Sequence, residues 1–214
     1  MAVKEEWAAL ADELGFEFKP GVRAFLESAA GRRELEERAK RGEIAGADLS
    51  FLENPLIRKM IELVFDGAVV GTHRDYEFTL FPASQARTSG TGSTRYSNVT
   101  TFFKESYALE LSIYNETFLS KVGKILFFQQ DIQVGDPELD QLVMIKGQDE
   151  LAVKRLLDSR RVRDQLITMF SESSGFTIRD FGIKHQEAAK VISRDHALHL
   201  MDQMVDLAEA LPPP

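Results

Sequence analysis

The stretch GDPELDQLVMIKG, residues 135–147, decides how the last third of the chain folds. Asp136 precedes Pro137, which is typical of a type I turn, because aspartate accepts a hydrogen bond and proline presets the next backbone angle. Leu139 is expected to point inward. The run LVMIKG has the composition of a core strand, and it ends at Gly147. The segment therefore predicts a turn that leads into a buried strand.

The same region also suggests a calcium loop, because four carboxylates lie close together in it. An EF-hand loop needs oxygen ligands at alternate positions, a glycine at the sixth position and a glutamate at the twelfth. Counting from Asp131, the sixth residue is Asp136 and the twelfth is Leu142. This spacing excludes an EF-hand loop and favours a structural turn. The four carboxylates are Asp131, Asp136, Glu138 and Asp140.

Outward from this stretch, apolar residues recur at helical spacing in several segments. Asn54-Pro55 is a good helix start, because it offers a capping side chain and then a proline at the first helical position. The clearest helix is the last one, where Leu200, Met204, Leu207 and Leu211 form one apolar stripe. Helices are predicted over 3–14, 21–41, 116–128, 150–157, 162–170 and 193–211.

Alternating apolar and polar residues predict strands in the middle and near the end of the chain. They are a strand through Tyr76, Phe78 and Leu80, a β-hairpin over 99–114, and two strands within 175–192 that turn near Gly182. GFEFKPG, residues 15–21, is a predicted turn, and 84–95 is a predicted loop. His73-Arg74-Asp75 is predicted to be a turn or part of a strand's exposed edge.

Together these elements predict an α+β fold with a mostly antiparallel sheet. An N-terminal helical segment, 1–66, precedes an α+β domain, 67–214, whose C-terminal helix packs on the sheet. A single continuous domain is the alternative.

The composition excludes several classes of function. The chain of 214 residues has no cysteine, so disulfides, zinc–thiolate sites and cysteine nucleophiles are absent. The net charge is −8, and no dense basic stripe is visible, so we expect no nucleic-acid partner. The N-terminus lacks the pattern of a secretory signal, and no apolar run approaches the roughly 20 residues that span a bilayer. We expect a soluble cytoplasmic protein without membrane contact.

Two segments carry a resemblance to a known family: WAALADELGFEFKPG near the start, and GDPELDQLVMIKGQDELAVKRLL later. They are similar to the WxxLAxxLGxxxxPG opening and the GDPxxD…KGxD…LL segment of a bacterial family of unknown function. The resemblance implies the order of the structural elements. It implies no activity and no site residue.

Two groups of residues are candidate sites. Arg87 and Arg95 flank a glycine-rich stretch that can bind an anion, although it lacks the lysine of a nucleotide-binding P-loop. The terminal helix places Asp195, His199, Asp202 and Asp206 on one face, as a divalent metal site requires. The alternative interpretations are a hairpin connection for the first group and a solvated helix face for the second.

Motifs for common catalytic chemistry are absent. The sequence holds neither a G-x-S-x-G elbow nor a G-x-G-x-x-G dinucleotide fingerprint. We therefore expect a non-catalytic binding or scaffold domain of a bacterial protein, with a protein or small ligand as partner and no cofactor. One alternative is a metal-dependent hydrolase that uses the His/Asp face of the terminal helix. Another is a peripheral membrane protein that binds through residues 116–128.

Overall fold

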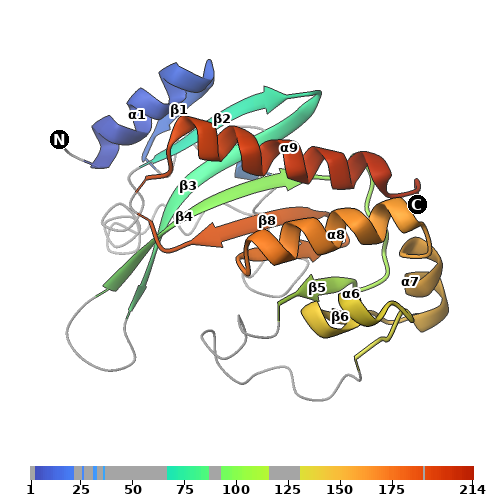
Figure 1. Cartoon of the computed structure of the whole chain (residues 1–214). Coiled ribbons are helices and arrows are strands. Elements are labelled where there is room, and N and C mark those ends of the chain that lie inside the picture. Colours follow the sequence, from blue (N-terminus) through green and yellow to red (C-terminus); the bar gives the residue numbers. More distant parts are fainter. Residues whose placement is uncertain are drawn as a thin grey trace. The chain divides into compact units, whose positions relative to one another are not determined.

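The computed structural model describes residues 3–21, 26, 31, 32, 36, 67–86, 93–115, 131–189 and 191–214 (Figure 1). Three predicted helices lie wholly or mostly outside these residues: the helix 21–41, the helix that starts at Asn54-Pro55, and the helix 116–128.

An eight-stranded antiparallel sheet has the strand order β1-β2-β3-β4-β8-β7-β5-β6. With helices packed on this sheet, the predicted α+β class is confirmed. The strands are β1 (Glu17–Pro20), β2 (Gly67–His73), β3 (Tyr76–Ala86), β4 (Ser93–Phe102), β5 (Ser112–Tyr114), β6 (Met144–Lys146), β7 (Phe176–Arg179) and β8 (Gly182–Glu187). Among the described residues, the helices are α1 (Val3–Leu14), α6 (Pro137–Leu142), α7 (Glu150–Leu156), α8 (Arg160–Glu172) and α9 (Arg194–Ala210).

The chain divides into two compact units. Unit 1 consists of Met1–Val99 and Glu187–Leu198, and unit 2 of Thr100–Gln186 and His199–Pro214. Each unit is thus built from segments that are distant in the sequence.

In unit 1, the helix α1 has the predicted bounds and buries Trp7 completely. It ends at Gly15, whose φ of +70° suits glycine. The predicted turn over 15–21 is wrong in part, because Glu17–Pro20 forms β1, which pairs with β2. This strand was not predicted because it is short and ends in a proline, a residue that is tolerated only at particular strand positions such as an edge.

Arg74 and Asp75 form the turn between β2 and β3, and His73 is the last residue of β2, so the segment predicted as a turn or a strand edge contains both. Arg74 and Asp75 have φ values of +49° and +66°, and His73 pairs with Tyr76 across the hairpin. Two consecutive residues with positive φ are the geometry of a type I′ turn, whose twist matches that of the strands. The next connection is shorter than predicted, because β3 reaches Ala86 and β4 starts at Ser93.

In unit 2, the two predicted strands that turn near Gly182 are confirmed as the antiparallel pair β7 and β8. The predicted hairpin over 99–114 is wrong. β5 pairs with β6 and β7, and β4 neighbours β3 and β8. Ala108 and Glu110 have positive φ values of +51° and +52°, which interrupt the extended backbone that a second hairpin arm requires.

The helices of unit 2 bury the faces that the sequence predicted. The apolar stripe of α9 is at most 8% exposed at each of its four residues, Leu200, Met204, Leu207 and Leu211. In α8, the predicted face is buried at Val162, Leu166 and Phe170 and half-buried at Ile167. These apolar faces position the polar residues that project from the ends of α8 and α9.

Candidate functional site

Asp131 in the acidic segment covers the edge of the sheet. Its Oδ1 accepts a hydrogen bond from the backbone N–H of Ile145 at 2.8 Å, and the Ile145 carbonyl accepts one from Ile132 N–H at 2.8 Å. Ile145 is the middle residue of β6, the last strand in the order. Since an open strand edge can pair with another chain, the carboxylate protects this edge.

The next two aspartates hold α6. Asp136 is its N-cap, and Oδ1 accepts hydrogen bonds from the amides of Glu138 and Leu139. Asp140 accepts hydrogen bonds from the amides of residues 134–135, at 2.9 and 3.0 Å. Leu139 is fully buried, as predicted. The predicted turn at Asp136-Pro137 is thus the capped start of a short helix, and these carboxylates serve the backbone.

Replacing Asp140 by alanine tests this structural role. The variant loses two charge-assisted hydrogen bonds in a partly exposed place, so we expect the free energy of unfolding to fall by about 1–2 kcal/mol. Urea denaturation measures it, with Glu138→Ala as the exposed control. Millimolar calcium should move the melting temperature of the wild type by less than about 1 °C. A calcium-dependent rise that Asp140→Ala abolishes contradicts the structural interpretation.

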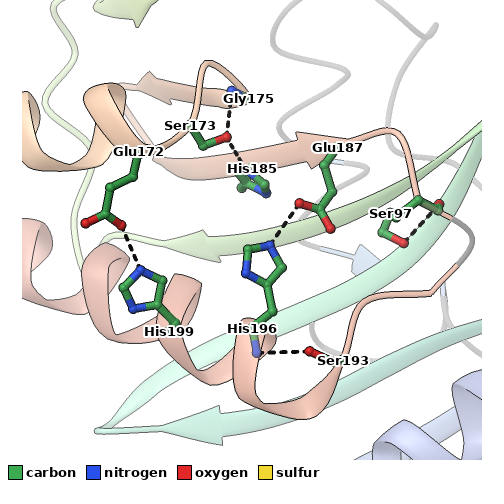
Figure 2. Close-up of polar contacts among 10 residues, drawn as sticks. Ser97, Glu172, Ser173, Gly175, His185, Glu187, Ser193, His196 and His199 are labelled. Carbon is green, nitrogen blue, oxygen red and sulfur yellow. Dashed lines mark hydrogen bonds and ion pairs between the residues drawn. The ribbon is translucent and has the colours of Figure 1, made fainter.

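A second polar cluster in unit 2 joins the end of α8 to α9 (Figure 2). Oε2 of Glu172, the last residue of α8, lies 2.8 Å from His199 Nε2 and accepts a hydrogen bond from Gln203 Nε2 at 2.6 Å. Glu172 and His199 are half-exposed, with 49% and 54% of their side chains accessible, whereas Gln203 is buried. The cluster therefore reaches solvent at its charged end.

The hydrogen bond from His199 is the main cause that holds the pKa of Glu172 below its ordinary value of 4.5, and the Gln203 amide lowers it further, against desolvation. A depressed folded-state pKa contributes stability above the unfolded-state pKa, and this stability is lost as the pH falls through the folded-state pKa. Because the pair is half-exposed, the contribution at neutral pH is at most about 0.5 kcal/mol.

We expect Glu172→Gln to be less stable than the wild type at pH 7 and equally stable below the folded-state pKa, where the wild-type carboxyl is protonated. Chemical denaturation of both proteins at several pH values between 7 and 3 measures the difference. The same comparison with Glu105→Gln, an exposed glutamate of the same unit, controls for general acid destabilisation. A difference that persists undiminished at pH 3 contradicts the assignment.

Ser173 and His185 form a serine–histidine pair beside this cluster (Figure 2). Ser173 Oγ lies 2.8 Å from His185 Nε2 and accepts a hydrogen bond from Gly175 N–H at 3.2 Å. In a hydrolase, a carboxylate would orient the histidine from its other nitrogen. The glutamates that bond histidines here, Glu172 and Glu187, bond His199 and His196 instead. His185 is fully buried and packs against Phe176, with ring centroids 4.6 Å apart and ring planes tilted by 55°, so this pair has a packing role.

His196 makes a similar contact within unit 1. Its Nε2 lies 2.9 Å from Glu187 Oε2, and its backbone N–H donates to Ser193 Oγ, which precedes α9 (Figure 2). The serine bonds the third residue after it, as an N-cap does. Ser193 and His196 therefore define where α9 begins.

The four residues predicted to bind a metal are not brought together as one ligand set. Asp195 contacts the neighbouring Arg194 at 3.1 Å, and His199 contacts Glu172. Within the parts of the chain that the structure describes, which include all four, no group of three or more acidic or histidine side chains is placed to hold a metal. The helical spacing of Asp195, His199, Asp202 and Asp206 alone does not form a site.

Only half of the predicted anion site lies among the described residues. Arg95 is exposed on β4, and Arg87 lies outside them. Anion binding by Arg87 and Arg95 stays a prediction.

Sequence analysis missed Glu172, Ser173 and His185. A signal for the last of them was present, because Ile183 and His185 alternate with polar residues in β8 and therefore share its buried side. No comparable signal marks Glu172, whose partners lie 27 and 31 residues away.

The chain was also compared with known proteins. No protein-family model matches the sequence, and no curated protein matches it. Among solved structures, the fold is similar to that of the mycobacterial trehalose monomycolate transport factor A, TtfA. The two share 14% sequence identity over 99% of this chain and 97% of that chain, with a TM-score of 0.51. The likeness is one of fold.

Among the residues described, no helix combines the length and the apolar character needed to span a membrane.

Proposed function

We propose that this chain is a non-catalytic domain that binds an amphiphilic lipid bearing a sugar headgroup. The observation that carries the proposal is the likeness of fold to TtfA along almost the whole of both chains. TtfA is a transport factor for trehalose monomycolate, which consists of a sugar and a long acyl chain. Trehalose monomycolate is therefore the first ligand to test.

The use of the carboxylates supports a binding role over a catalytic one. Asp131, Asp136, Asp140 and Asp180 each accept hydrogen bonds from backbone amides. A general base must instead reach the proton of a bound substrate, and a metal ligand must present its oxygen to the ion. These four aspartates therefore support the fold, and their oxygens are engaged by the backbone.

The hydrolase alternative has weaker support. Its proposed ligands on α9 form no metal-holding group among the described residues, and His199 is engaged by Glu172. The Ser173–His185 pair places its histidine inside the protein, out of reach of solvent. We therefore favour binding over hydrolysis.

Thermal unfolding with and without trehalose monomycolate tests the proposal. At a free concentration 100 times the dissociation constant, binding stabilises the native state by about 2.7 kcal/mol, which raises the melting temperature of a chain this long by about 5–10 °C. Native mass spectrometry should show a one-to-one complex. Free trehalose and the free mycolic acid serve as controls, and we expect smaller shifts from each. No complex and no rise with the intact glycolipid overturn the proposed ligand.

A further inference from the structure

Positive charge is concentrated in one short part of unit 2. Residues 131–214 hold ten lysines and arginines, and five of them lie within 154–163, where the only acidic residue is Asp158. This gives a local charge of +4 in a chain whose net charge is −8. The five residues are Lys154, Arg155, Arg160, Arg161 and Arg163.

The structure places these residues at the junction of two helices. α7 ends at Leu156 and α8 begins at Arg160, so only three residues separate them (Figure 1). Arg155, Arg160 and Arg161 are exposed. Here the "arginine corner" denotes Leu151, Lys154, Arg155, Arg160 and Arg161.

The charges of the arginine corner are only partly neutralised within the chain. Lys154 pairs with Glu150 at 2.7 Å, and Arg160 lies 3.6 Å from Asp164 with 91% of its side chain exposed. Arg155 and Arg161 form no ion pair with any residue that the structure describes. Two guanidinium groups therefore remain available to an external carboxylate.

An exposed leucine lies among these cations. Leu151 is 68% exposed. Within the described part of the chain, no other large hydrophobic residue is classed as exposed. Lys154 and Arg155 follow it by three and four residues on α7, so the three side chains share one helix face. An apolar anchor beside arginines is typical of protein–protein interfaces, in which arginine is enriched.

The start of α8 adds to this positive potential. The positive end of a helix dipole favours acidic residues, but the first turn of α8 holds none. Ser159, its N-cap residue, makes no capping hydrogen bond with its side chain. A partner's carboxylate would supply the negative charge that this helix end lacks.

We propose that the arginine corner is a docking surface for an acidic segment of a partner protein. Its helix α7 has seven residues and is therefore about 10 Å long, the scale of a peptide segment. A bilayer or a nucleic acid would extend over more of the chain, whose excess negative charge repels both. Four of the five cations within 154–163 are arginines, whose planar guanidinium groups bind carboxylates with two parallel hydrogen bonds. Docking here is independent of glycolipid binding, and either can hold without the other.

Fluorescence anisotropy with a labelled hexaglutamate peptide at low salt tests this surface. We expect the intact chain to bind the peptide, and the double variant Arg155→Ser/Arg161→Ser to bind it about tenfold more weakly. Leu151→Ser should lower the affinity for a peptide in which leucines alternate with glutamates. It should leave the affinity for hexaglutamate unchanged.

The matched control is Lys4→Ser/Arg32→Ser, which removes the same charge from exposed positions of unit 1. We expect its affinity to stay within about twofold of the wild type. If both double variants lose the same affinity for the peptide, the peptide is attracted by the general charge of the chain, and the proposed docking surface is overturned. So does the absence of peptide binding, or binding to phosphatidylserine-containing vesicles without binding to hexaglutamate. Circular dichroism spectra confirm that the variants fold.

Discussion

Replacement of Gly182 by alanine is expected to lower the free energy of unfolding by about 3 kcal/mol. A Cβ atom at this position would lie closer than 3.0 Å to the backbone carbonyl oxygen of Thr101 and 3.0 Å from the Cα of Phe102. Both contacts are with the backbone of β4, which neighbours β8 in the sheet, so no side chain can move aside. The two strands must separate locally to admit the methyl group. Guanidinium denaturation measures the loss.

Gly135→Ala is the matched control for this prediction. Gly135 has a φ of +80° and nothing within 4 Å of the added Cβ, so alanine there bears only the strain of the backbone, about 1 kcal/mol. If Gly182→Ala is no more destabilised than Gly135→Ala, then β4 and β8 do not approach each other as closely as described.

Asp180→Ala is expected to cost about 2–3 kcal/mol, the second largest effect. Oδ1 of this half-buried side chain accepts hydrogen bonds from the amides of Leu109 and Leu111, both at 3.0 Å. Alanine leaves both donors without this acceptor. It also releases the positive-φ backbone at Ala108 and Glu110 that the two bonds hold in place. The loss is measured by urea denaturation.

Two further substitutions define what the Asp180 side chain contributes. Asp180→Asn keeps an oxygen acceptor and should recover at least half of the loss. Asp158→Ala removes an exposed carboxylate from the same unit and should change stability by less than about 0.5 kcal/mol. A stability of Asp180→Ala equal to that of Asp158→Ala contradicts the anchoring role.

Sequence periodicity predicted the helices and strands that are defined by residues close together in the sequence. The bounds of α1 and the buried stripe of α9 follow from 3.6-residue spacing, and β7 and β8 from alternation around a glycine. The pairing of β5 could not be predicted in this way. Its neighbours β6 and β7 lie far along the chain, and the loop before it is held by Asp180, about 70 residues later.

The candidate sites show the same limit. Spacing distinguished the acidic run from an EF-hand loop, but it did not reveal that Asp131 bonds an amide 14 residues away. The helix face of Asp195, His199, Asp202 and Asp206 had the right spacing for a metal, but among the described residues no three acidic or histidine side chains converge to hold one. Local patterns place side chains on a face, whereas a site requires faces from different elements to converge.

The two segments that carry the family resemblance correspond to defined pieces of structure. WAALADELGFEFKPG covers most of α1 and all of β1, and the later segment covers α6, β6 and α7. Both are therefore structural motifs. Membership of that family stays a prediction.

Incubation of the purified chain with trehalose monomycolate, followed by mass spectrometry of both the complex and the free products, tests the central claim of binding without turnover. We predict a one-to-one complex from which the glycolipid is recovered intact after prolonged incubation, with or without added divalent metal. Release of trehalose that increases with time, and that His199→Ala or Ser173→Ala abolishes, would contradict the account and establish a hydrolase.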